Sequence, residues 1–409
     1  MKYQAYQAHA DMMSGMRFLT DSARTALAHP FFAGFDALRK LDAAYEVFSS
    51  AEVTHTRPDF AIHTVITGEG AQAHEVAVEE IAAHVLPFGT LLNFRKVGIT
   101  NQPRVLIVAP MSGHFATLLR ETARTMLADH DVYITDWHNA RDVPLSAGRF
   151  GLDEYTEYVM TFLEIMGPGS HVVAICQPCV SALAAVAIMA EDRNPAQPLS
   201  LTLMAGPIDC RINPTGVNEL ATSKPFEWFE KNLISTVPMR HKGAMRRVYP
   251  GFMQLAAFMS MNMERHVDAF KGMYQNLLDG EHEKKATTQA FYEEYFAVLD
   301  LTAEFYLETI KQVFQDYALP LGKLEWRGRI VNPAAIRRTA LLTVEGERDD
   351  ICALGQTMAA HDLCTGIPPF MKSHHMQAGV GHYGVFSGRR WNKQIYPRVR
   401  ELIYSTTQA

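Results

Sequence analysis

The residues best suited to chemistry lie at 171–183, where Cys176 stands between a short apolar run and an alanine-rich run. The β-branched residues before Cys176 predict a strand, and the alanines after it predict a helix. Such a turn lifts a nucleophile above the sheet, and the N–H of the next residue, Gln177, points at the same place. The pattern therefore indicates a nucleophile elbow, whose thiol would carry out acyl transfer.

Two other interpretations of the same residues stay open. Cys176 and Cys179 are spaced as a Cys-x-x-Cys pair, which is typical of thiol–disulfide exchange. Cysteines in an apolar run also act simply as small buried side chains. Glycine usually flanks an elbow, and Ala174 and Pro178 take those places here. Alanine is small enough for the turn, and proline is tolerated in the first turn of a helix.

A nucleophile of this kind needs an acid and then a histidine further along the chain, each just past a strand. The apolar run 341–344 ends in a turn that carries Asp349 and Asp350, and His382 follows in a glycine-rich loop. Imidazole takes the thiol proton, and a carboxylate fixes the imidazole tautomer and favours its charged form. The order and placement of these residues predict a Cys–acid–His triad.

A second oxyanion-binding N–H is expected in the segment 110–115, which follows the first core strand. We assign it to the backbone around Met111 and Ser112, opposite the N–H of Gln177. His114 lies in the same segment and is the alternative general base. Its place after an early strand suits ordering of the loop or the substrate better.

The elements that must position these groups alternate along the chain. Fully apolar strands that alternate with helices predict a parallel sheet covered by helices on both faces. Strands are expected at 105–110, 132–136, 172–175, 199–204 and 339–344, with helices at about 115–128, 152–166 and 391–404.

The segment from about 209 to 335 shows no clear strand and is rich in methionine and aromatic residues. Its place, after the elbow and before the closing strands, is that of a helical lid. Most of these side chains are expected to form the lid's own core, but such residues also suit adaptable apolar binding surfaces. Met253, Phe258 and Met259 are the candidate substrate-binding residues.

These patterns divide the chain into four expected segments. Residues 1–50 have helical spacing broken by Pro30 and predict an N-terminal helical layer. Residues 51–208 form the first part of the α/β core, 209–335 the lid and 336–409 the second part of the core. The apolar positions of the N-terminal layer are Met12, Met16, Phe18, Leu19, Phe31, Phe32, Phe35, Leu38 and Leu41.

The composition and charge of the chain argue against several classes of protein. The net charge of −6 over 409 residues gives no support to nucleic-acid binding. Five scattered cysteines argue against a disulfide framework and for a reducing compartment. The N-terminus lacks the apolar core of a signal peptide, and the longest apolar run, 180–190, is too short to span a bilayer. We expect a cytoplasmic protein that binds no metal, nucleic acid or membrane.

Together these residues carry a resemblance to the intracellular poly(3-hydroxybutyrate) depolymerases with a cysteine nucleophile. The resemblance covers nearly the whole chain and implies an α/β-hydrolase fold. It places Cys176 as the nucleophile, His382 as the base and either Asp349 or Asp350 as the acid. We choose Asp349, because similar hydrolases keep one residue between the acid and the next aliphatic residue. The matching segments are 109–114, 136–137, 140–141, 176–178, 204–209, 248–252, 291–295, 343–351 and 381–384.

The resemblance implies attack on amorphous polyester at storage granules in the cytoplasm, without a cofactor. A cysteine nucleophile gives a thioester intermediate, so coenzyme A is an alternative acyl acceptor to water at little cost in free energy. The products are then 3-hydroxybutyrate, its oligomers or 3-hydroxybutyryl-CoA. The oligomeric state, including a homo-oligomer, stays open.

Three rival functions are weighed against this one. A polyester synthase runs the same triad in reverse, but its elbow keeps flanking glycines and its acid is followed by histidine, where this chain has Pro178 and Asp350. A thiol–disulfide oxidoreductase would use Cys176 and Cys179. A granule-coating protein would use only the apolar segment and need no nucleophile.

Overall fold

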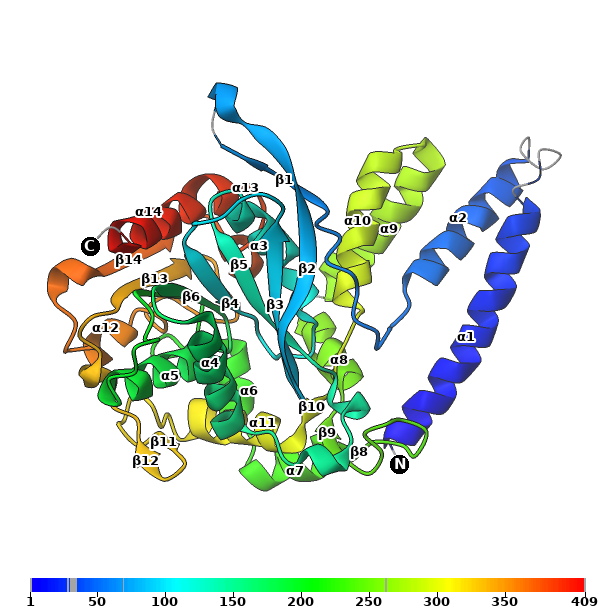
Figure 1. Cartoon of the computed structure of the whole chain (residues 1–409). Helices are drawn as coiled ribbons and strands as arrows, with labels where there is room; N and C mark the ends of the chain where they lie inside the picture. Colours follow the sequence, from blue (N-terminus) through cyan, green and yellow to red (C-terminus); the bar gives the residue numbers. More distant parts are fainter. Residues whose placement is uncertain (1, 28, 30–34, 69, 262, 408–409) are drawn as a thin grey trace.

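The computed structural model describes residues 2–27, 29, 35–68, 70–261 and 263–407 (Figure 1). In these ranges nine strands form one sheet, antiparallel from β1 to β5 and parallel from β5 to β14. This confirms the α/β-hydrolase fold. The strands, in spatial order, are β1 (Thr64–Thr67), β2 (His74–Leu86), β3 (Gly89–Lys96), β5 (Asp131–Trp137), β4 (Arg104–Val108), β6 (Ser170–Ile175), β7 (Ser200–Met204), β13 (Ala340–Gly346) and β14 (Lys372–Gln377).

The central strands are buried along their whole length. Every residue of β6, β7 and β13 is buried, because helices cover both faces of the sheet. Figure 1 shows α4 (Leu152–Met166) and α5 (Cys179–Glu191) on one face, with α3 (Arg120–Leu127) and α14 (Tyr396–Thr407) on the other. The carboxyl ends of β4, β6, β13 and β14 therefore meet at one edge, which is where the candidate triad lies.

The segment between β7 and β13 is mainly helical, as expected. The expectation that it holds no strand is wrong, because pieces of two or three residues are too short to show a periodicity. Its helices are α6 (Gly216–Thr222), α7 (Phe226–Leu233), α8 (Gly251–Met261), α9 (Met263–Asp279), α10 (His282–Tyr295), α11 (Ala303–Glu308) and a π-helical segment, Thr309–Gln315. Its strands are β8 (Ser235–Thr236), β9 (Arg247–Tyr249), β10 (Leu301–Thr302), β11 (Glu325–Trp326) and β12 (Arg329–Ile330).

The N-terminal segment is helical but does not cover the sheet as a layer. Helices α1 (Lys2–Leu27) and α2 (Asp36–Ser50) pair with each other and project beside α9 and α10 (Figure 1). Tyr3 anchors α1, because its ring is buried and its hydroxyl donates to the Asp300 carboxylate. The expected apolar residues Met12, Met16, Phe18, Leu19 and Leu41 are exposed, whereas Pro30, Phe31 and Phe32 lie outside the described residues.

Within the described ranges, no helix combines the length and the hydropathy that crossing a bilayer requires.

Candidate active site

Cys176 occupies a strained turn between β6 and α5. Its φ is +67°, in the left-handed region that residues other than glycine rarely adopt. Its backbone N–H donates to the Met204 carbonyl at 2.7 Å, and this bond ties the turn to the end of the neighbouring strand β7. The elbow geometry expected from the sequence is present, and the surrounding strands hold the strain in place.

Cys179 is placed to pack, not to exchange disulfides. It is completely buried, and its Sγ donates to the Ala174 carbonyl at 3.3 Å. Burial raises the pKa of this thiol, which disfavours the reactive thiolate. A Cβ at Gly206 would come within 2.2 Å of the Cys179 Sγ, so this glycine, two residues past the end of β7, supplies the space for the packing. Both Cys176 and Cys179 are free thiols.

His382 is paired with Asp349 at the edge of the sheet. The His382 Nδ1 donates to the Asp349 Oδ2 at 2.8 Å. The other carboxylate oxygen accepts the N–H groups of Ile351 at 2.9 Å and Cys352 at 2.8 Å. Asp350, the next residue, is exposed. Asp349 is therefore the carboxylate that orients the imidazole.

The loops that carry Asp349 and His382 are joined directly. The Arg348 N–H donates to the Val380 carbonyl at 2.8 Å. Gly346, the last residue of β13, permits this approach, because a Cβ there would lie 2.8 Å from the Val380 oxygen. The spacing between acid and base is thus fixed by backbone contacts.

An apolar cavity of about 410 Å³ opens over Cys176. Met111, Ser112 and Gln177 line this cavity together with Cys176, so the two segments expected to bind the oxyanion meet at the elbow. The rest of the lining comes from the lid and the acid loop: Val217, Leu220, Ala221, Trp228, Phe229, Leu233, Tyr249, Met253, Gln254, Ala257, Phe258, Ser260, Leu301, Phe305, Tyr306, Thr309, Ile310, Phe314 and Ile351.

Two of the three candidate substrate-binding residues line this cavity. Met253 and Phe258 do so, and Met259 is not among the lining residues. Met259 packs with Leu255, one helical turn before it, on the cluster around Tyr292. Met259 thus packs on residues of α10, while Phe258, the residue before it, contacts the same cluster and also lines the cavity.

A family model described as "PHB de-polymerase C-terminus" matches residues 205–407, which include the lid, Asp349 and His382. The chain belongs to this family through its C-terminal half. Membership makes the protein a carboxylic ester hydrolase.

No curated protein sequence matches the hydrolase. Its fold is similar to that of a putative lipase from Acinetobacter baumannii AYE, at 13% identity over 81% of this chain and 93% of that chain, with a TM-score of 0.43. A thermophilic esterase from Thermogutta terrifontis is similar at 12% identity over 84% of this chain and 98% of that chain, with a TM-score of 0.42. Structural similarity at this level of identity and TM-score does not identify a function.

The charges around His382 favour its protonated form. Burial, the largest influence, lowers the pKa of this imidazole, but Cys176 and Asp349 both oppose it. Their attraction for the imidazolium, with hydrogen bonds to each side chain, raises the pKa of His382 well above its ordinary value of 6.5. The surroundings of His382 in the hydrolase thus favour a charged imidazole.

We expect the His382 ring protons in NMR spectra to report a pKa above about 6.5 in the wild type. In Asp349→Asn that pKa should fall, because one of the two attractions is removed. Since folding raises the pKa, the contribution of charged His382 to stability is complete below about pH 6.5 and is lost as the pH rises through the folded value. A neutral His382 at pH 6 in the wild type would contradict this.

His114, the alternative base, is committed elsewhere. Its Nε2 donates to the Tyr295 carbonyl at 3.1 Å, and it is not among the residues lining the cavity. Burial lowers the pKa of His114 to about 4, so the imidazole is neutral. It ties the segment after β4 to the lid helix α10.

Some supporting residues were not anticipated from the sequence. Glu345 is a buried carboxylate in β13 that accepts the N–H groups of Gly355, Thr357 and Met358 at 2.8–2.9 Å. It fixes the loop that follows the acid. The sequence feature that could have identified Glu345 is a charged residue inside an otherwise apolar strand. No comparable sequence feature marked Leu220 and Trp228, which line the cavity.

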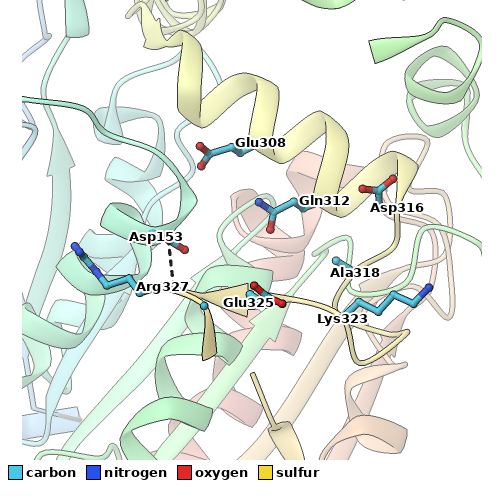
Figure 2. Close-up of a pocket in the computed structure, with 9 residues that line it drawn as sticks. Asp153, Glu308, Gln312, Asp316, Ala318, Lys323, Glu325 and Arg327 are labelled. Carbon is cyan, nitrogen blue, oxygen red and sulfur yellow. Dashed lines mark hydrogen bonds between the residues drawn. The ribbon is translucent and has the colours of Figure 1, made fainter. Parts of the chain in front are cut away.

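A second cavity of about 520 Å³ shares no lining residue with the first (Figure 2). It is polar, and its charges are largely engaged with neighbouring groups. The Arg327 N–H donates to Asp153 at 3.2 Å, and Glu308 pairs with Arg149 and accepts the Leu152 N–H. We assign no part of the reaction to it.

Proposed function

We propose that the protein depolymerises amorphous poly(3-hydroxybutyrate), with Cys176 as nucleophile, His382 as general base and acid, and Asp349 as the orienting carboxylate. The observation that carries the proposal is the apolar cavity directly above Cys176, with the His382–Asp349 pair beside it. The family match supports the same substrate class.

In the proposed reaction the Cys176 thiolate attacks an ester carbonyl and forms a carbon–sulfur bond. Backbone N–H groups of Gln177 and Met111 stabilise the oxyanion. The tetrahedral intermediate then releases the alcohol end of the chain, which takes its proton from His382. A water molecule, deprotonated by His382, attacks the thioester and releases the acid, and the thiol is restored.

A polyester chain suits this cavity because it is uncharged and mostly apolar. Its binding must come mainly from burial of methyl and methylene groups. The mouth of the cavity carries Leu220, 56% exposed, and Trp228, 36% exposed, which offer such a chain an apolar entrance. We expect the cavity to admit one mobile chain at a time.

The experiment is turbidity clearance with native amorphous granules and with the same polymer after crystallisation. We expect rapid clearance of the amorphous granules and a rate at least tenfold lower on crystalline polymer, whose chains are held by their neighbours. No clearance of amorphous granules would overturn the function. Equal rates on both would overturn the one-chain cavity and favour an open surface site.

The acyl acceptor is part of the same proposal. Transfer of the acyl group from Cys176 to coenzyme A exchanges one thioester for another, so thiolysis accompanies hydrolysis when coenzyme A is present. We expect 3-hydroxybutyryl-CoA in a granule reaction supplied with coenzyme A, measured by liquid chromatography and mass spectrometry. Free acid as the sole product would limit the acceptor to water.

We place the reaction on granules in the cytoplasm. The free thiol of Cys176 and the buried thiols around it suit a reducing compartment. Fractionation of cells that store the polymer, with antibody detection of the protein on washed granules, tests this placement.

A further inference from the structure

The side chain of Gln177 occupies one half of the oxyanion-binding site. The Met111 N–H donates to the Gln177 Oε1 at 3.3 Å, and both residues line the cavity beside Cys176. A backbone N–H can only donate, so the amide oxygen is the atom that faces it. An amide carbonyl therefore stands where the carbonyl oxygen of an ester must go.

The contact has a physical reason in the absence of substrate. Met111 is only 1% exposed, and a buried N–H without an acceptor is costly. Gln177 supplies that acceptor from the adjacent turn. The bond is longer than the usual range of about 2.7–3.2 Å, so it is weak enough for a substrate to displace.

We propose that Gln177 is a positioning residue that closes the oxyanion site of the free enzyme and withdraws when an ester carbonyl enters. This inference rests on the proposed function, because it takes Met111 and Gln177 as the oxyanion donors. Substrate binds only to the open form of the enzyme. Closure by Gln177 reduces the fraction of enzyme that is open, and KM rises by the same factor. Once the ester is bound, Gln177 no longer competes and kcat is unaffected.

The test uses p-nitrophenyl butyrate, a soluble ester that removes effects of a polymer surface. Gln177→Leu keeps a similar volume but has no acceptor, and KM should fall about threefold to tenfold, as expected for one net hydrogen bond, with kcat within about twofold. Gln177→Glu has a charged acceptor that binds the N–H more strongly, so KM should rise about tenfold or more.

The opposite signs of the two effects distinguish gating from structural support, which predicts loss in both variants. Gln312→Leu, the same replacement at a glutamine in the second cavity (Figure 2), is the matched control and should leave KM unchanged. Thermal unfolding shows whether each variant is folded.

An unchanged or raised KM in folded Gln177→Leu would overturn the inference. So would a fall in KM for both variants, because the charged acceptor must hold the site closed. Cys176→Ala, assayed on the same ester, tests the proposed function separately. If that variant still hydrolyses the ester, the proposed function fails, whatever the Gln177 variants show.

Discussion

Replacing Cys176 or His382 by alanine is expected to abolish ester cleavage, with kcat lower by about 10⁵-fold or more for each variant. The two residues act as a unit, because attack on the ester needs a thiolate and departure of the alcohol needs a proton from the imidazole. The double variant should therefore be little worse than either single variant. Hydrolysis of p-nitrophenyl butyrate and clearance of amorphous granules measure this loss.

Cys179→Ala is the matched control, because it removes the other thiol of the Cys-x-x-Cys pair. Cys179 is buried against Gly206 and its Sγ donates to the Ala174 carbonyl, so this variant should lose stability but keep most of its activity. A redox enzyme would lose its activity with either cysteine. If Cys176→Ala retains hydrolysis while Cys179→Ala does not, the assignment of the nucleophile is wrong.

Asp349→Asn is expected to reduce kcat by about 10⁴-fold, the loss found when the acid of a triad becomes an amide. The amide can hold His382 in the wrong tautomer, because its NH₂ group donates where the carboxylate accepted. It also removes the charge that stabilises the imidazolium. The measurement is kcat on the soluble ester, together with the pKa of His382 from NMR.

Asp350→Asn provides the comparison, since it makes the same change one residue along the turn. Asp350 is exposed, and the carboxylate that accepts from His382 is that of Asp349, so kcat should stay within about threefold of the wild type. A larger loss in Asp350→Asn than in Asp349→Asn would move the acid by one residue while leaving the fold and the chemistry as they are.

The core of the fold could be predicted because its signals are local. Strand β6 and helix α4, Leu152–Met166, follow from short periodic patterns of apolar residues, and their burial agrees with those patterns. The lid strands β8 to β12 could not be predicted, because pairing of two or three residues depends on distant partners. The projection of α1 and α2 away from the sheet is likewise a tertiary outcome, since helical spacing does not say what a face will contact.

The sequence by itself determined the kinds of catalytic group and their order, because a strand that ends on a nucleophile and loops that carry acid and base are local features. Only the tertiary structure decided which aspartate pairs with His382, where Met259 points, and that Gly206 makes room beside the elbow. It also decided that Gln177 reaches Met111. Most of these contacts join residues that are far apart in the chain, and the choice between the two aspartates depends on side chains one position apart on a turn. Packing in three dimensions decides both, so local sequence patterns cannot.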